Sequence, residues 1–225
     1  MKKPKILVTG AAGRTGAAAV NELLKKNFPV RAFVRKRDSR AVALEKAGAE
    51  IFVGDLFDFH DVSKAMIGVQ RAYHCPPFAA NLLEGNMVFA LAAEEAKLEV
   101  VALLSGWNDN SEHPSIVTRH HLIAKQLYLW MPSVVVFHIN PGIFAFIYML
   151  GLQSIVPFGM FMATFGEGRN APPSNEDIAR VAVATLIEPK QHIGKSYRPT
   201  GPKLLSPYDV ATILGNILNR KVKYK

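Results

Sequence analysis

Three glycines near the N-terminus are the first residues whose spacing indicates chemistry. Gly10, Gly13 and Gly16 follow a short apolar run and precede a helical pattern. Such a strand–turn–helix unit is typical of a loop that binds a dinucleotide pyrophosphate, in which bare backbone and the helix N-terminus face the phosphates. The third glycine lets the helix pack close to the strand. We expect the cofactor contacts to come from the whole turn: Gly10, Ala12, Gly13, Arg14, Thr15 and Gly16.

A basic run ends the second predicted strand, about 20 residues beyond the glycines, where NAD-binding proteins carry an acidic side chain for the ribose. Arg35 and Lys36 occupy this place here. Their charges suit a ribose 2′-phosphate, so the sequence favours NADP(H) over NAD(H). A solvated basic turn would have the same residues, and Asp38 could cap the helix that follows.

A carboxylate and an apolar side chain follow the third predicted strand. Asp55 is placed to accept a hydrogen bond from the adenine amino group, and Leu56 to pack on the ring. Alternatively, Asp55 or Asp58 caps the helix expected over residues 61–67. The sequence leaves both uses open.

The elements that must position these residues alternate regularly between strand and helix. Strands are expected at 5–9, 30–34, 50–53, 71–75, 100–104 and 134–139, with helices between them. Six such units predict an α/β fold with a doubly wound parallel sheet, the Rossmann type, in residues 1–140. Pro76 and Pro77 stop the fourth strand at the edge where ligands bind in such sheets. The order of the strands is not visible in the sequence.

Residues 141–225 are expected to form a small C-terminal substrate lobe, interleaved with the dinucleotide-binding domain. Residues 143–165 are apolar and aromatic, so they would line a pocket for a flat or apolar ligand, fill a core, or do both. Polar residues, proline and glycines interrupt this segment, and a membrane span is not expected. Helices are expected over 176–187 and 206–218, and a short strand over 196–200.

Composition and charge exclude several classes of protein. The net charge of +9 is scattered along the 225 residues, which an anionic cofactor explains better than nucleic-acid binding. The single cysteine, Cys75, excludes an intrachain disulfide, and we expect it to be inert. No signal-peptide pattern precedes the first strand, so a cytoplasmic protein is expected. His113, His120 and His121 lack ligand spacing, and no metal site is expected.

Taken together, these motifs resemble the NmrA-like branch of the atypical short-chain dehydrogenases/reductases. The resemblance covers most of the chain and rests on Thr9–Gly16, Val34–Arg35, Gly54–Leu56, Lys125, Asn140–Gly142 and Asn175–Ala179. It implies a Rossmann domain, a small C-terminal lobe and bound NADP(H). Some members of the family reduce quinones or other carbonyl-type substrates, whereas others bind the cofactor as redox sensors. Family chains usually run several dozen residues beyond the point where this one ends, so the resemblance leads us to expect a truncated lobe.

The resemblance also implies a role for individual side chains. Arg14 and Arg35 would hold phosphate groups, and Lys125 would hydrogen-bond the nicotinamide ribose. The residues expected along the nicotinamide half and the far side of the cofactor are Pro76, Pro77, Phe78, Asn140, Pro141 and Gly142.

The catalytic residues depart from the usual pattern, because the usual acid is missing. Ordinary short-chain dehydrogenases carry a tyrosine four residues before the lysine, and here that position is His121, preceded by His120. Imidazole titrates near neutral pH and could replace the phenol. Ser105, at the end of the fifth predicted strand, occupies the place of the polarising serine. We expect Ser105, His121 and Lys125, with His120 as a second candidate, to form a reductase site; two surface histidines on a cofactor-binding helix are the alternative.

The sequence therefore predicts an NADP(H)-binding oxidoreductase of the NmrA-like type that reduces a quinone-like or other small apolar carbonyl substrate. The alternative is a non-catalytic NADP(H) redox sensor that acts through a protein partner. A nucleotide-sugar epimerase or dehydratase is disfavoured by the missing tyrosine and the apolar cleft segment. Whether the chain forms a homodimer stays open.

Overall fold

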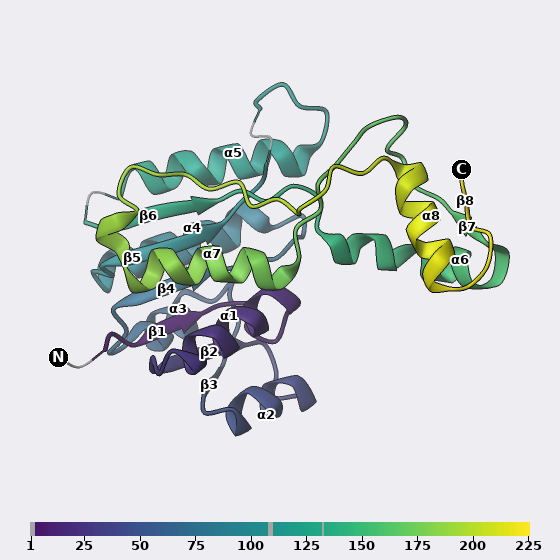
Figure 1. Cartoon of the computed structure of the whole chain (residues 1–225). Coiled ribbons are helices and arrows are strands. Elements are labelled where there is room, and N and C mark those ends of the chain that lie inside the picture. The colour runs from purple at the N-terminus through teal and green to yellow at the C-terminus, as the bar shows by residue number, and fades with distance from the viewer. Residues whose placement is uncertain (1–2, 108–109, 132) are drawn as a thin grey trace.

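A six-stranded parallel sheet forms the centre of the computed structural model, which describes residues 3–107, 110–131 and 133–225 (Figure 1). The strand order is β3-β2-β1-β4-β5-β6, so the chain reverses direction across the sheet between β1 and β4. The strands are β1 (Ile6–Val8), β2 (Val30–Val34), β3 (Glu50–Val53), β4 (Arg71–His74), β5 (Val100–Leu104) and β6 (Val135–Ile139). This is the doubly wound Rossmann sheet that the alternating pattern predicts.

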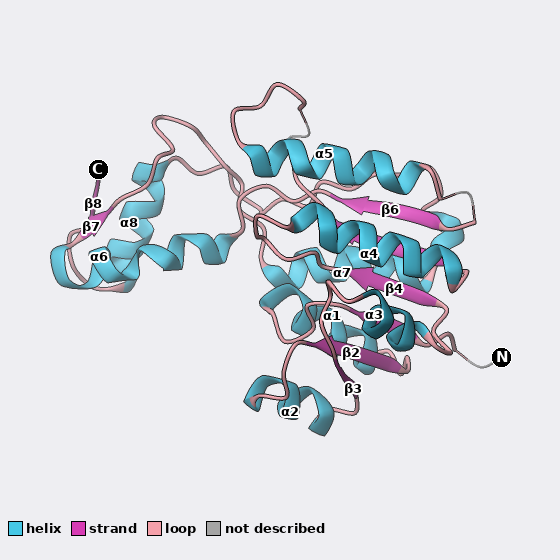
Figure 2. Cartoon of the chain, turned by 180° about the vertical axis from the view of Figure 1, so that it is seen from behind, coloured by secondary structure: helices cyan, strands magenta, loops and turns pink. Residues whose placement is uncertain are grey.

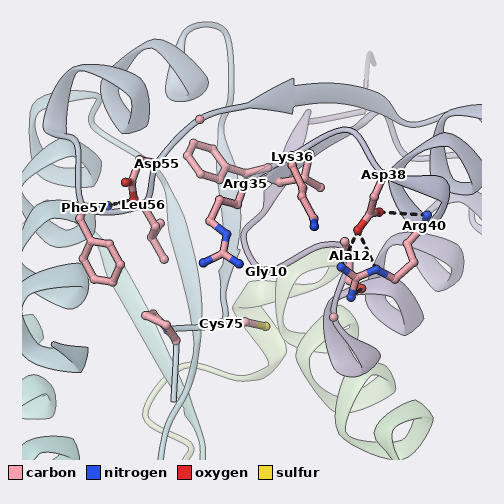
Figure 3. Close-up of a pocket in the computed structure, with 15 residues that line it drawn as sticks. Gly10, Ala12, Arg35, Lys36, Asp38, Arg40, Asp55, Leu56, Phe57 and Cys75 are labelled. Carbon is pink, nitrogen blue, oxygen red and sulfur yellow. Dashed lines mark hydrogen bonds and ion pairs between the residues drawn. The ribbon is translucent and has the colours of Figure 1, made fainter. Parts of the chain in front are cut away.

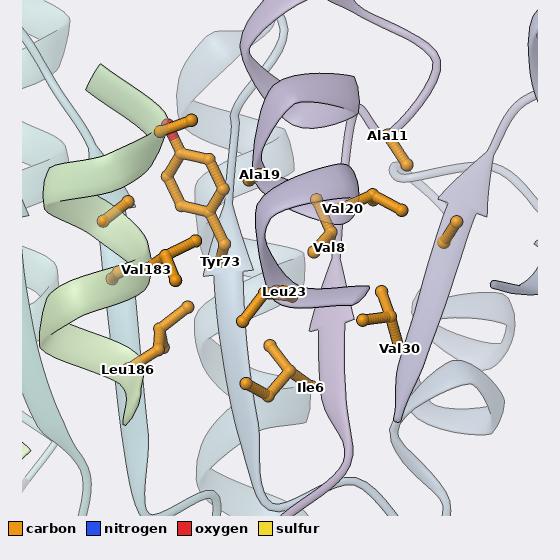
Figure 4. Close-up of a cluster of buried hydrophobic side chains, with 14 of the residues drawn as sticks. Ile6, Val8, Ala11, Ala19, Val20, Leu23, Val30, Tyr73, Val183 and Leu186 are labelled. Atoms are coloured by element: carbon orange, nitrogen blue, oxygen red, sulfur yellow. The ribbon is translucent and has the colours of Figure 1, made fainter. Parts of the chain in front are cut away.

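Helices cover both faces of the sheet, as Figure 2 shows from behind. One face carries α1 (Arg14–Lys25), α2 (Ser39–Lys46) and α7 (Asn175–Ile187); the other carries α3 (Phe59–Met66), α4 (Leu82–Glu95) and α5 (Ile116–Leu129). Successive residues of a strand point to opposite faces, and in β1 all three are buried. Ile6 and Val8 pack under α1 and α7 (Figure 4), whereas Leu7 belongs to the core on the opposite face.

The helix α7 lies far along the chain but packs beside α1. Its Val183 and Leu186 are fully buried in the same cluster as Leu23 of α1 (Figure 4). Ser174 caps α7, since its hydroxyl oxygen accepts a hydrogen bond from the Asp177 N–H at 3.0 Å. Part of the chain after residue 140 therefore completes the helical layer over the central strands.

The remaining C-terminal segments form a small lobe beyond the carboxyl edge of the sheet (Figure 1). Its elements are the 3-10 helix η1 (Ala145–Gly151), α6 (Leu152–Phe158), β7 (Met160–Phe161), α8 (Pro207–Ile217) and β8 (Lys223–Tyr224), and a further turn, η2 (Pro189–Gln191), follows α7. Tyr148, Ile155 and Phe161 pack with Val210 and Leu214 of α8. Much of the apolar segment 143–165 thus fills the core of the lobe.

Two local expectations differ from the structure. The helix expected from residue 61 begins at Phe59, because the Asp58 carboxylate accepts hydrogen bonds from the N–H groups of His60 (2.8 Å) and Asp61 (3.0 Å). Residues 196–200 form only an isolated bridge, in which Tyr197 pairs with Ile139 along the outer edge of β6. None of the helices in the described segments combines the length and apolar character that a membrane span requires.

In the glycine turn, two stretches of backbone approach so closely that no side chain fits between them. Gly10 has a φ of +58°, in the left-handed region that favours glycine. A Cβ at Gly16 would lie 2.3 Å from the Gly10 carbonyl oxygen and 2.8 Å from its carbonyl carbon. The third glycine of the motif therefore permits the contact between the start of α1 and the turn that precedes it.

We predict that Gly16→Ala destabilises the protein by about 1–3 kcal/mol, because the new methyl group forces the helix away from the loop. Alanine normally stabilises a helix relative to glycine, so the sign of the change tests the steric argument. Asn21→Ala, at an exposed position of the same helix, is the matched control and should be neutral or slightly stabilising. Urea unfolding measures both, and a Gly16→Ala protein as stable as the wild type would contradict the prediction.

Candidate cofactor-binding site

An open cleft of about 250 Å³ lies at the carboxyl ends of β1, β2 and β3 (Figure 3). The turn after β1 forms its floor, and the segments that follow β2, β3 and β4 form its walls. Among the residues expected to bind the cofactor, the structure brings Gly10, Ala12, Gly13, Arg35, Lys36, Asp55, Leu56 and Pro77 to this cleft. Open α/β sheets bind ligands at this kind of place, where the strand order reverses.

The floor of the cleft is bare backbone at a helix N-terminus. Gly13 is the N-cap of α1 and supplies no capping side chain, while its N–H donates to the Gly10 carbonyl at 2.8 Å. A Cβ at Gly13 would lie 3.0 Å from that carbonyl oxygen. The N-terminus of α1, with the positive end of the helix dipole, therefore begins at the floor of the cleft, which fits a pyrophosphate.

A cluster of cations forms the wall at the end of β2. Arg35 and Lys36 are exposed and line the cleft, as the charge pattern predicts. A third cation, Arg40, was not identified from the sequence. Its guanidinium donates to the Asp38 carboxylate at 2.6 Å and to the Ala12 carbonyl at 3.3 Å, so it joins the start of α2 to the glycine turn (Figure 3).

Asp38 has two structural functions. Its carboxylate caps α2 by accepting from the N–H groups of Arg40 (3.0 Å) and Ala41 (3.2 Å). The side-chain hydrogen bonds from Arg40, more than the backbone ones, lower the pKa of Asp38 to about 2. The carboxylate is therefore charged at neutral pH and holds the Arg40 side chain at the edge of the cleft.

The wall at the end of β3 contains Asp55, Leu56 and Phe57 (Figure 3). The Asp55 carboxylate accepts from the Phe57 N–H at 3.0 Å, and the Asp55 N–H donates to the Asp61 carboxylate at 2.9 Å. Asp58, not Asp55, caps α3. Asp55 is thus placed at the cleft by its own turn.

At the end of β4, buried polar groups hold the strand next to the glycine turn. The Thr9 hydroxyl accepts from the Cys75 N–H at 2.9 Å and lies 3.0 Å from Nδ1 of His74. The His74 ring is fully buried and stacks on Phe89 with centroids 3.8 Å apart. Burial lowers the pKa of His74 to about 3 and raises the pKa of the Cys75 thiol to about 12, so at neutral pH His74 is uncharged and Cys75 is a thiol.

Two of the candidate catalytic residues, Ser105 and His121, lie close together at the end of β5. Ser105 is 7% exposed, and its hydroxyl has no hydrogen-bond partner within the described segments. The next residue, Gly106, contacts the His121 ring so closely that a Cβ would lie 3.1 Å from Cδ2 of the imidazole. Lys125 lies one helical turn beyond His121 and is half-buried, as is His120 on the adjacent face of α5. The structure therefore places His121 beside the strand end that carries Ser105.

The same helix carries the nearest tyrosine, which has a different environment. Tyr128 is buried between α5 and α4, and its hydroxyl lies 3.3 Å from the side-chain oxygen of Asn86. Burial raises its pKa well above the ordinary value. Tyr128 is therefore part of the core and does not replace the missing tyrosine.

The segment after β6 closes this end of the sheet. Asn140 is buried, and its side-chain amide donates to the Ser196 hydroxyl at 2.9 Å. Pro141 is buried, and a Cβ at Gly142 would lie 3.8 Å from the Trp107 ring. The Arg198 guanidinium lies over that ring, 5.3 Å from its centroid. Trp107 and Arg198, which sequence reasoning missed, thus flank the strand ends that carry Ser105 and Asn140.

Four of the remaining expected site residues lie outside the cleft that Figure 3 shows. The Thr15 hydroxyl donates to the side-chain oxygen of Asn175 in α7 at 3.1 Å, and the Arg14 guanidinium lies over the ring of Phe146. Gly16 is buried against Gly10, and Pro76 is half-buried beside Pro77.

The fold and the glycine turn define a Rossmann-type nucleotide-binding protein, and comparison with known proteins specifies the family. The profile of the NmrA-like family matches residues 2–225, so the chain belongs to this family.

The individual proteins that the chain resembles share less than a third of its residues. An NAD(P)H azoreductase of Xenophilus azovorans is 28% identical over 219 residues, which cover 97% of this chain and 76% of the relative. Among solved structures, an NADPH-dependent quinone oxidoreductase from Escherichia coli, complexed with NADPH, superimposes with a TM-score of 0.85 at 22% identity. A nucleoside-diphosphate-sugar epimerase from Staphylococcus aureus gives 0.87 at 17% identity. Both superpositions cover 98% of this chain. They cover 77% of the quinone oxidoreductase and 79% of the epimerase. At these identities the superpositions show the fold alone.

The buried imidazole at the end of β4 gives a pH-dependent prediction. Below pH 6.5 the unfolded chain binds a proton at His74 that the native protein, with a pKa of about 3, does not bind. Stability therefore falls as the pH falls from 6.5 toward 3, by up to about 1.4 kcal/mol per pH unit from this group.

Replacing His74 by leucine removes this contribution while keeping an apolar side chain against Phe89. As the pH is lowered from 7 to 5, we expect the free energy of unfolding of the wild type to fall more than that of His74→Leu. Urea unfolding at pH 7, 6 and 5 measures it. Other titrating groups are common to both proteins, so a constant difference would show that His74 is protonated in the native state.

Proposed function

We propose that this protein is an NADPH-dependent oxidoreductase that reduces a quinone-like or other small apolar carbonyl compound. The observation that carries the proposal is the cleft itself, in which bare glycine backbone at a helix N-terminus adjoins three cationic side chains. The relative from Xenophilus azovorans is an NAD(P)H azoreductase, and the similar quinone oxidoreductase is complexed with NADPH.

The cleft provides for each part of the adenosine half of the cofactor. Arg35, Lys36 and Arg40 would hold the 2′-phosphate, because guanidinium and ammonium groups form charge-assisted hydrogen bonds with phosphate oxygens. Asp55 would accept from the adenine amino group, and Leu56 would pack on the ring. NADP(H) is therefore the preferred cofactor in this proposal, and NAD(H) the weaker one.

The other half of the cofactor would extend past Pro76 and Pro77 toward the ends of β5 and β6. Lys125 would hydrogen-bond the nicotinamide ribose, and Asn140, Pro141 and Gly142 would close the far side. NADPH, when bound, supplies the hydride. The chain's own residues then position the substrate and provide the proton.

His121 and Ser105 are proposed as the residues that contact the substrate carbonyl. The buried Ser105 hydroxyl would donate a hydrogen bond to the carbonyl oxygen and thereby satisfy its own hydrogen-bonding capacity. The His121 imidazole, packed on Gly106, would give a proton to the same oxygen as negative charge develops there. His120 lies on the adjacent helix face and is the weaker candidate.

One observation favours a second function, namely a redox sensor that binds NADP(H) without turnover. The position of the usual catalytic tyrosine is a histidine, and Tyr128 is locked in the core. Such a sensor would need the cofactor cleft but not the hydroxyl or the imidazole at the end of β5. A spectrophotometric assay of NADPH oxidation with a panel of quinones and aldehydes separates the two functions. NADPH binding without turnover of any of them would exclude the reductase.

The cation cluster predicts the cofactor preference. Arg35→Ala should weaken NADPH binding about 10- to 100-fold, since a hydrogen bond between charged groups contributes about 1.5–3 kcal/mol. NADH has no 2′-phosphate, so its dissociation constant should change less than threefold, by a rough estimate. Isothermal titration measures both.

Arg37→Ala is the matched control, because Arg37 belongs to the same basic run but pairs with Glu45 at 2.5 Å and does not line the cleft. It should bind both cofactors as the wild type does. If Arg35→Ala and Arg37→Ala lose NADPH affinity equally, the effect is one of overall charge and the assignment of Arg35 is wrong.

The two histidines of α5 predict a catalytic difference. His121→Ala should lower kcat about 100-fold or more, the usual contribution of a general acid, with little change in NADPH affinity. His120→Ala is the matched control and should retain most of the activity. Steady-state kinetics with the best substrate of the panel measure both, and equal activity of the two variants would remove His121 from the proposed mechanism.

A further inference from the structure

The first turn of α1 is attached to two segments that lie far along the chain. The Thr15 hydroxyl donates to the Asn175 side chain at 3.1 Å, at the start of α7. The Arg14 guanidinium lies over the face of the Phe146 ring, 5.0 Å from its centroid. Phe146 belongs to η1, the helical segment that leads from the sheet to the lobe (Figure 1). One side chain of the glycine turn thus contacts the lobe.

The two segments that α1 contacts are also joined to each other. The N–H of Ala145, the residue before Phe146, donates to the Pro173 carbonyl at 3.0 Å, directly before the cap of α7. The ring of Phe144 packs edge-on against Phe146, with centroids 5.8 Å apart, and Phe144 itself packs on the core under α1. The backbone directly before Phe146 is therefore bonded to the segment that precedes α7, and the Phe146 ring itself packs on Phe144.

Elsewhere the lobe has little packing against the sheet domain. Within the described segments, α6, β7, α8 and β8 pack mainly on one another and on η1, and far less on the strands and helices of the sheet. Through Phe146, η1 is therefore an element of the lobe that contacts the first turn of α1 directly.

A ring contact of this kind leaves the hydrogen-bonding capacity of arginine intact. The aromatic ring uses the flat face of the guanidinium, whereas phosphate is bound by the N–H groups in its plane. Arg14 is exposed and is the first residue of α1, so without a partner its long side chain would lose rotational freedom on binding an anion. A ring that already holds the guanidinium reduces that cost.

We propose that Phe146 is a positioning residue for the cofactor: it holds the Arg14 guanidinium at the glycine turn for a pyrophosphate and so couples the placement of the lobe to cofactor affinity. This inference rests on the proposed function, in that the glycine turn must bind NADPH. Because coupling is reciprocal, bound NADPH also stabilises η1 against α1.

A double-mutant cycle tests whether Phe146 acts through Arg14. Phe146→Leu should weaken NADPH binding about two- to fivefold, the contribution of an exposed cation–π contact, whereas Phe146→Tyr, which keeps the ring, should bind as the wild type does. In an Arg14→Ala background, Phe146→Leu should cause no further loss. With saturating NADPH, kcat should be unchanged, so that the variant differs only in KM for NADPH. Phe158→Leu, at an exposed phenylalanine of the lobe, is the matched control and should have no effect.

Hydrogen exchange gives a second measurement that does not depend on activity. NADPH should slow exchange of the η1 amides in the wild type and in Phe146→Tyr, but not in Arg14→Ala. Thermal unfolding of each variant verifies that it is folded. Independent, additive effects of the two substitutions on NADPH affinity would overturn the inference while leaving the proposed function intact. A wild-type protein that does not bind NADPH would overturn the proposed function and this inference with it.

Discussion

The approach of Gly16 to the Gly10 carbonyl is the contact on which the cofactor side of the molecule depends. A side chain at position 16 would move α1 outward, since even a Cβ would lie only 2.3 Å from the carbonyl oxygen. With α1 seated on the turn, its N-terminus lies at the end of the central strand β1, between β2 and β4. The reversal of strand order at this point leaves a crevice beside the N-terminus of α1. From the same turn the Thr15 hydroxyl donates to Asn175 at the start of α7, which adds a polar contact to the apolar packing of α7 beside α1.

Strand register then sets what lies at each end of the crevice. β4 pairs with β5 so that His74 lies opposite Leu103, and β5 pairs with β6 so that Leu104 lies opposite Ile139. The residues that follow these strands, Cys75, Ser105 and Asn140, consequently reach one edge. The cations lie on the other side of β1, after β2. In the proposed function, the adenosine end of the cofactor and the reacting end are thus separated by the sheet topology.

The parts of this arrangement that could be predicted from the sequence are those that depend on neighbours in the chain. Apolar runs, glycine spacing and capping residues give the strands, the turn and the positions of Arg35 and Asp55 to within a residue or two. Arg40 was missed because its contact with the Ala12 carbonyl joins two different turns. Phe146 and Arg198 were missed for the same reason, since their partners Arg14 and Trp107 are distant in sequence. Strand order, which places β4 beside β1, has no local signature.

Two polar groups at neighbouring strand ends show why burial alone does not identify a site. His74 is enclosed by Phe89 and held by the Thr9 hydroxyl, so its burial is accounted for by the packing of β4 against the glycine turn. Ser105 is nearly as buried, but its hydroxyl has no partner in the described part of the chain and it lies at the edge of the sheet beside the His121 ring. A buried hydroxyl without a partner costs about 1–3 kcal/mol. Nε2 of the His74 ring is likewise buried without a partner in the described segments, so an unsatisfied atom does not by itself separate the two strand ends. The difference lies in the surroundings: the Phe89 ring covers the His74 ring, whereas Ser105 lies at the end of β5 beside the His121 ring. This is the physical reason to assign chemistry to the end of β5 and a structural function to the end of β4.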